Sequence, residues 1–213
     1  GDQYGIYLDN VVRFKVEGVR AYDFRTAGAN SAAIMAANCT EADSTISAIV
    51  SNSGEGGDGI HVLASSGITI TRFHTYTNTG AGVSYFNCSD ITIRNGRTHN
   101  NGAEGVKGHR GTTVTFSYRT IVFGVHSYEN GEEGIDIDDT FYAIIGPDNH
   151  CYLNNQAGIC LDNARHSLVI GNHCMENSQE LDNTYSGIEL TWGDGAHGGA
   201  GAGYCEYNLV TNN

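Results

Sequence analysis

The chain has 213 residues, enough for one sizeable core, and nothing in its composition marks a second domain. Its formal net charge of −13 speaks against nucleic acid as a partner, because phosphate binding depends on Lys and Arg. No apolar run approaches the roughly 20 residues of a membrane helix, so we expect no membrane partner either. The 29 Gly against a single Pro indicate many tight turns rather than disorder.

A four-residue motif recurs along the chain at intervals of 23 to 29 residues. It consists of a small residue, Ile or Val, a variable residue and, in most copies, an apolar residue. This alternation predicts a short half-buried strand, with the second and fourth residues directed inward and the third outward. The eight copies lie at residues 5–8, 33–36, 59–62, 82–85, 105–108, 134–137, 158–161 and 187–190.

Further strand-like segments follow most copies of the motif. A second strand is expected at residues 68–70, 91–93, 114–116 and 168–170. A third, which closes on Asn each time, is expected at residues 73–78, 96–101, 125–130, 149–154 and 172–177. Three short strands per repeat without a helical period predict an all-β fold: a single-stranded, right-handed parallel β-helix of about eight coils.

Equivalent residues of successive coils should stack at roughly 4.8 Å, so that the closing asparagines form a ladder of side-chain amides. This ladder would contain Asn78, Asn101, Asn130, Asn154 and Asn177. A β-sandwich is the alternative fold, but it does not predict residue columns of this kind.

The repeat resembles that of the pectate-lyase-like superfamily, which includes polysaccharide lyases and hydrolases, alginate epimerase modules and phage tailspike depolymerases. The resemblance covers nearly the whole chain at the level of fold. It implies a polysaccharide partner and a location that is extracellular, on the cell surface or on a virion. It transfers no catalytic motif: residues 108–111 precede the acids at 136–139, the reverse of the polygalacturonase order, and Ile137 and Asp138 replace the Pro-His of the epimerases.

Residues 206–213 align with residues 165–172, which lie in the middle of a coil. We therefore expect residues 1–213 to form a single β-helix domain that belongs to a longer β-helix or is capped by a partner.

Ionisable residues gather at the outward strand positions from the fifth motif onward, whereas the first four motifs are bland there. Ladder spacing would stack Asp138 on Asp162, with Asp136 and Glu189 at their flanks. The candidate catalytic residues are Asp136, Asp138, Asp162, Glu189, Lys107 and His109.

Two reactions suit this patch. Stacked carboxylates raise one pKa, and a protonated acid beside an ionised carboxylate is the pair that glycoside hydrolysis requires. Alternatively, Lys107 or His109 abstracts the proton next to a uronate carboxylate that Arg110 neutralises, which is β-elimination. Neither reaction requires a cofactor, although Asp138 and Asp162 would accept a Ca²⁺ ion.

A Gly-rich segment at residues 193–203 follows the Glu189 strand, and we expect a loop that closes over a sugar chain. The substrate-binding candidates are Arg110, Trp192, Asp194 and His197. The six cysteines are expected to be mostly unpaired, buried thiols, because the chain is larger than the small scaffolds that disulfides stabilise. No CxxC spacing suggests a zinc site.

The third strands should expose two adjacent columns of aromatic and basic residues, and so long a strip is typical of an association surface. Together with the resemblance to trimeric phage spikes, it predicts a homotrimer. The columns are His74, Arg97, His126, His150, His173 and Tyr76, His99, Tyr128, Tyr152, Met175. The alternative to an enzyme is a non-catalytic structural or adhesive β-helix of a phage fibre or surface filament.

Overall fold

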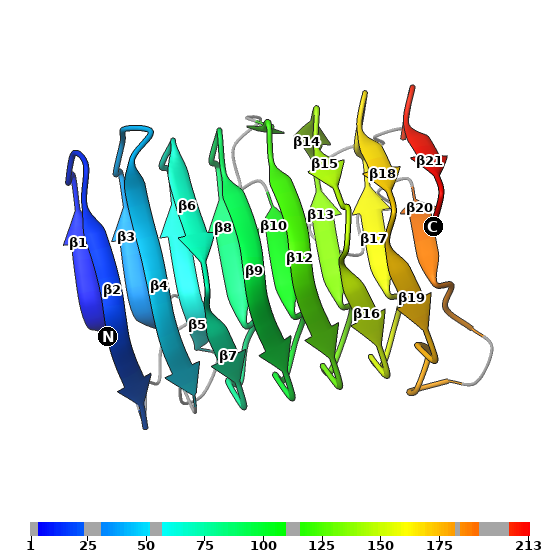
Figure 1. Ribbon diagram of the computed structural model, residues 1–213, viewed down its shortest axis with the longest axis horizontal. Coiled ribbons are helices and arrows are strands. Elements are labelled where there is room, and N and C mark those ends of the chain that lie inside the picture. The colour runs from blue at the N-terminus through cyan, green and yellow to red at the C-terminus, as the bar shows by residue number, and fades with distance from the viewer. Residues whose placement is uncertain (1–3, 24–30, 52–56, 110–115, 182–183, 192–204) are drawn as a thin grey trace.

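The computed structural model describes residues 4–23, 31–51, 57–109, 116–181, 184–191 and 205–213. These residues wind into a parallel β-helix whose coils follow one another along the long axis of the molecule, from the N-terminal to the C-terminal end (Figure 1). The described residues contain strands, turns and bends but no helix, and so no helix among them could span a membrane. The predicted all-β class and parallel β-helix are confirmed.

The repeated motif forms the first sheet, with one strand from each of the eight copies. Every neighbouring pair in this sheet is parallel and in register. In spatial order its strands are β1 (Tyr4–Asp9), β3 (Ala32–Ala37), β5 (Asp58–Leu63), β8 (Val83–Phe86), β10 (Val106–His109), β13 (Ile135–Asp138), β17 (Ile159–Asp162) and β20 (Ile188–Thr191).

The second and third strand positions of the coils belong to one sheet, the second sheet. They run together in the long strands β2 (Lys15–Tyr22), β4 (Ser44–Ser51), β9 (Thr92–His99) and β12 (Ile121–Tyr128). Elsewhere they are separate strands: β6 (Ile68–Thr71), β7 (His74–Tyr76), β15 (Ile144–Ile145), β16 (His150–Tyr152), β18 (Leu168–Ile170), β19 (His173–Met175) and β21 (Leu209–Thr211). A small third sheet pairs β11 (Ser117–Tyr118) with β14 (Thr140–Phe141).

One predicted strand was misplaced. The segment at residues 114–116 falls mostly outside the described residues, and the second-sheet strand of that coil begins only at Ile121. The pattern Val-Thr-Phe matched the repeat, but the longer coil places the strand after the turn at Arg119, whose φ is 55°.

The core is a set of apolar columns between the two sheets. Inward residues of the first sheet, such as Ile60, Val83, Val106 and Ile135, are fully buried and pack with those of the second sheet in one cluster. The motif glycine is required because a neighbouring coil comes close. A Cβ on Gly158 would lie 2.6 Å from the Gly187 carbonyl oxygen and 2.7 Å from Asn177 Nδ2.

The predicted asparagine ladder is confirmed, and it links successive coils of the β-helix. Each Nδ2 donates to the Oδ1 of the next rung, as from Asn101 to Asn130 at 3.0 Å and from Asn130 to Asn154 at 2.9 Å. Each Oδ1 also accepts the backbone N–H of the preceding rung. The Asn130 N–H, for example, donates to Asn154 Oδ1 at 3.1 Å. A second amide ladder, absent from our expectations, links Asn149 to Asn172 and Asn172 to Asn213, each at 2.9 Å.

Candidate functional site

Six ionisable side chains gather on the outward face of β10, β13 and β17, and we call them the acidic cluster. Strand register brings Lys107 beside Asp136, and Asp138 beside Asp162, so the predicted stacking of Asp138 on Asp162 is confirmed as a pairing of strand positions. The cluster consists of Glu104, Lys107, Glu133, Asp136, Asp138 and Asp162.

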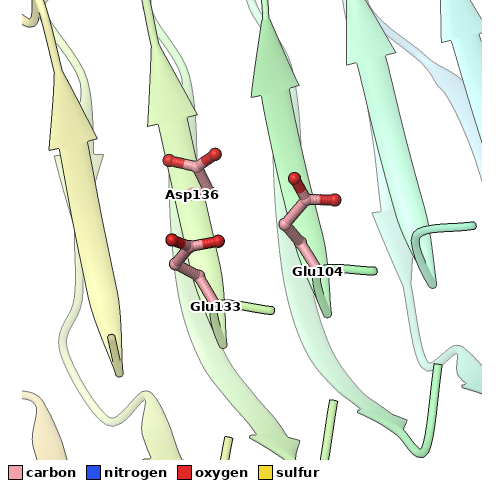
Figure 2. A group of neighbouring side chains, drawn as sticks. All are labelled: Glu104, Glu133 and Asp136. Carbon is pink, nitrogen blue, oxygen red and sulfur yellow. The ribbon is translucent and has the colours of Figure 1, made fainter. Parts of the chain in front are cut away.

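The carboxylates of Glu104, Glu133 and Asp136 converge on one another. Figure 2 shows them projecting from two neighbouring coils toward a common space, and one oxygen of each lies within 4.8 Å of the others. The ammonium of Lys107 forms an ion pair with Glu104, and its Nζ lies 3.8 Å from Asp136 Oδ2.

The acidic side chains are buried, although we expected an outward, solvated face. Asp136, Asp138 and Asp162 are only 6%, 5% and 8% exposed, and Glu104 is 2% exposed. The third and fifth motif positions do point away from the core. The expectation of exposure was wrong because coils stacked at roughly 4.8 Å leave little room for water between neighbouring side chains.

Burial raises the pKa values of three carboxyl groups in the cluster. Burial and the charge of Asp136 raise the pKa of Glu133 to about 8. Burial likewise raises the pKa of Asp138 to about 7, although a hydrogen bond from Asp136 and the ammonium of Lys107 oppose the shift. Burial and the neighbouring Asp138 raise the pKa of Asp136 well above its usual range.

Lys107 is held in its charged form. Burial alone would lower the pKa of its ammonium, but the carboxylates of Glu104 and Asp136 outweigh burial and raise that pKa. The cluster thus sets one permanent cation against five carboxyl groups, so some of these carboxyls retain protons near neutral pH. Such an array can donate a proton from one carboxyl while an adjacent one remains ionised.

A second buried polar group lies on the same sheet, two coils nearer the N-terminus, where we expected bland residues. His61 Nδ1 lies 2.9 Å from Asp58 Oδ2 and 2.6 Å from Ser84 Oγ, and Ser84 Oγ donates to Asp58 Oδ2 at 2.5 Å. Among the described residues, Nε2 of His61 has no hydrogen-bond partner. The expectation failed because a single His or Ser in an outward column carries no visible signal until the fold supplies its partner.

The residues that sequence reasoning missed share one position. Asp58, Glu104 and Glu133 each stand immediately before the motif glycine, three residues before His61, Lys107 and Asp136 respectively. They reach those partners past the motif glycine, as the hydrogen bond between Asp58 and His61 and the ion pair between Glu104 and Lys107 show. Three acids at one repeat position were the signal that could have revealed them.

Two other predicted site residues have partners outside the acidic cluster, and the rest fall outside the described residues. Glu189 pairs in register with Cys160, and its Oε1 accepts the Ser186 N–H at 2.6 Å. The ring of His109 stacks on Phe86 with centroids 4.9 Å apart. Arg110, Trp192, Asp194 and His197, with the whole Gly-rich segment, fall outside the described residues.

Both predicted columns of the third strands are confirmed by register. The rings stack from coil to coil, with centroids 4.7 Å apart for His99 and Tyr128 and 4.8 Å for Tyr128 and Tyr152. His126, His150 and His173 form a parallel stack with both spacings at 4.8 Å.

The six cysteines are unpaired, as expected. Three of them donate to backbone carbonyls at the turn after the first strand, as Cys88 does to Phe86 at 3.1 Å. Cys151 and Cys174 differ, because they occupy paired positions on β16 and β19, and the neighbouring Cys174 together with burial raises the pKa of the Cys151 thiol.

Solved structures share this fold. The A-module of the mannuronan C-5 epimerase AlgE6 from Azotobacter vinelandii matches all of this chain and 79% of its own, with a TM-score of 0.63 and 15% identity. The periplasmic alginate epimerase AlgG matches 97% of this chain at a TM-score of 0.64 and 15% identity, and this chain covers 47% of it. A tailspike protein of an Escherichia coli O157:H7 bacteriophage matches 93% of this chain and 25% of its own, with a TM-score of 0.56 and 12% identity.

These identities establish the fold alone, and the chain spans about half of AlgG. No curated protein matches the chain. A protein-family profile, in contrast, matches residues 1–200, nearly the whole sequence. The chain therefore belongs to the family described as periplasmic copper-binding protein (NosD).

Proposed function

We propose that this chain binds and cleaves a polysaccharide on the outward face of its first sheet, and that the acidic cluster performs the cleavage. The observation that carries the proposal is the burial of five carboxyls around one ammonium. Burying charges disfavours folding unless each is paired, and one lysine cannot pair with five carboxyls. Perturbed, coupled groups of this kind are typical of catalytic sites.

Hydrolysis is the reaction that the cluster suits best. Asp138, with a pKa of about 7, would protonate the glycosidic oxygen, as a raised-pKa carboxyl does in glycosidases. Asp162 stands on the next coil, roughly 4.8 Å away along the ladder. That spacing is nearer to the roughly 5 Å of retaining enzymes than to the wider gap of inverting ones, so Asp162 would act as the nucleophile.

A uronate polymer would allow β-elimination on the same face. Because Lys107 stays protonated, it would neutralise the uronate carboxylate rather than act as the base. His109 on the same strand would then abstract the proton. Arg110, Trp192, Asp194 and His197 remain candidates for holding the sugar chain beside the cluster, and Glu189 remains a candidate catalytic residue.

The comparisons support a carbohydrate outside the cytoplasm. One of the similar structures is named as a mannuronan C-5 epimerase, another as an alginate epimerase and a third as a phage tailspike, and the family is described as periplasmic. We therefore propose a polysaccharide substrate and a periplasmic or extracellular location. The prediction that Asp138 and Asp162 accept Ca²⁺ stays a proposal, to be tested by chelation during the assay.

We also propose that the aromatic strip, the two stacked columns on the third strands, packs against copies of the same chain in a homotrimer. Met175 in the strip is 52% exposed, and the Tyr76, Tyr128 and Tyr152 rings are partly exposed. Continuous aromatic surfaces of this kind are typical of association faces.

A polysaccharide panel that includes alginate tests the proposed function. Release of reducing ends without absorbance from unsaturated uronate would indicate hydrolysis, and both signals together would indicate elimination. If neither signal appears but a polysaccharide still binds, the chain is the non-catalytic structural or adhesive rod, and the enzymatic proposal fails.

A further inference from the structure

The column of small inward residues on the third strands changes character in its last two coils. It runs in register through Thr75, Thr98 and Ser127, and then Cys151 and Cys174. Cys151 is fully buried in the apolar core, and Cys174 is partly exposed and packs against the same core.

The hydroxyl rungs and the thiol rungs interact differently. Thr98 Oγ1 donates to the Gly105 carbonyl at 3.0 Å, and Ser127 Oγ donates to the Gly134 carbonyl at 2.7 Å. Cys151 and Cys174 instead occupy paired positions on neighbouring coils, so that one thiol stands next to the other. The last two rungs of the column thus place two soft sulfur ligands side by side in the core.

Copper is the metal in the family description. Two other groups of side chains are compared with the cysteine pair as ligands for it. The convergent carboxylates of Glu104, Glu133 and Asp136 suit hard cations rather than copper. The Nε2 atoms of His74 and His99 lie 2.8 Å apart, but they share a hydrogen bond and the charge of Arg97 is nearby. Soft thiolates in an apolar setting select Cu(I).

The spacing of the coils fits a two-coordinate ion. Two thiolates on opposite sides of one metal ion, each about 2.3 Å away, stand about 4.6 Å apart. In-register neighbours on a parallel sheet are separated by roughly 4.8 Å, so both thiols can reach one ion without rearrangement of the strands. Zinc would require about four ligands, and the described residues provide no further thiol or imidazole in a convergent group.

We infer that Cys151 and Cys174 form a two-thiolate Cu(I) site inside the C-terminal coils. Binding releases both thiol protons, so copper affinity rises with pH. The site is separate from the acidic cluster, and the inference stands or falls independently of polysaccharide cleavage.

Anaerobic titration of the reduced chain with Cu(I), in competition with a chromogenic Cu(I) chelator, tests the inference. We expect the chain to retain a single Cu(I) ion, and Cys151→Ser and Cys174→Ser each to lose it. Serine already occupies the neighbouring rung at residue 127, so both variants should fold, which circular dichroism checks. Cys88→Ser removes a buried thiol that donates to carbonyls, and it should leave binding unchanged.

X-ray absorption of the loaded chain should show two sulfur neighbours and no nitrogen shell. The inference is overturned if the chain retains no Cu(I), or if the two serine variants bind it as the unmodified chain does. Loss of binding in His99→Gln with retention in Cys151→Ser would assign copper to the histidine pair instead.

Discussion

At the scale of single residues, the acidic cluster shows what a strand pattern reveals and what it hides. The outward positions of Asp136, Asp138 and Asp162 followed from the alternation of the motif. Glu104 and Glu133 could not be placed, because they lie at a bend where the alternation stops. The burial of the cluster could not be predicted from the sequence either, since it depends on how closely the coils stack.

The raised pKa values predict how stability varies with pH. Asp138 and Glu133 keep their protons to about pH 7 and pH 8 in the folded chain, but lose them near pH 4 when unfolded. The folded state therefore binds more protons in this interval, and these groups make the free energy of unfolding fall as pH rises. Each bound proton contributes a slope of about 1.4 kcal/mol per pH unit.

Urea unfolding between about pH 4.5 and pH 8 measures this slope. Asp138→Asn and Glu133→Gln should each flatten the fall relative to the unmodified chain. Asp9→Asn changes a carboxylate on β1 that is exposed to solvent, and it should leave the slope unchanged. Parallel curves for all four proteins would show that the cluster carboxyls are ionised in the folded state.

At the scale of elements, the ladders hold the coils in register. The asparagine ladder was predictable because its residue recurs at a fixed place before the motif. The second ladder was not, because Asn149, Asn172 and Asn213 begin or end segments whose strand boundaries vary. The joining of the second and third strands in β9 and β12 was likewise hidden, since the turn residues between them resemble those of a true corner.

Asn130→Ala should lower the melting temperature clearly. The Asn130 amide donates to Asn154 and Ser127 and accepts from Asn101, so its loss leaves buried partners unsatisfied, at about 1–3 kcal/mol. Asn155→Ala is the matched control, since this neighbouring side chain makes no hydrogen bond in the described structure. Asn100 is a poorer control, because its φ is 52° and its Oδ1 bonds to His99. Equal melting temperatures for the two variants would contradict the role of the ladder.

At the scale of the whole molecule, the two proposed roles, polysaccharide cleavage and self-association, lie on different strands of the β-helix. The first sheet presents the acidic cluster, and the third strands present the aromatic strip. The eight-coil architecture followed from the period of the motif, whereas the partner of each face depends on contacts that a single chain does not contain.

The proposed homotrimer should loosen as pH falls. Burial and the neighbouring His150 lower the pKa of His126, and burial with His99 lowers that of His74. Protonation of stacked imidazoles places like charges together, so association should weaken below about pH 6. Light scattering at about pH 7.5 and pH 5 should show a trimer that dissociates. A monomer at both values, well above micromolar concentration, would exclude the interface.

The acidic cluster is the proposed cleavage site of the β-helix. The most direct measurement is the turnover of Asp138→Asn and Asp162→Asn, beside Asp9→Asn, on the most rapidly degraded member of the panel. Removal of an acid or a nucleophile should lower turnover by about 10²-fold or more in the first two variants, with the fold intact by circular dichroism. Asp9→Asn, at the equivalent position of the first coil, should retain full activity. Equal activity in all three variants would contradict the claim.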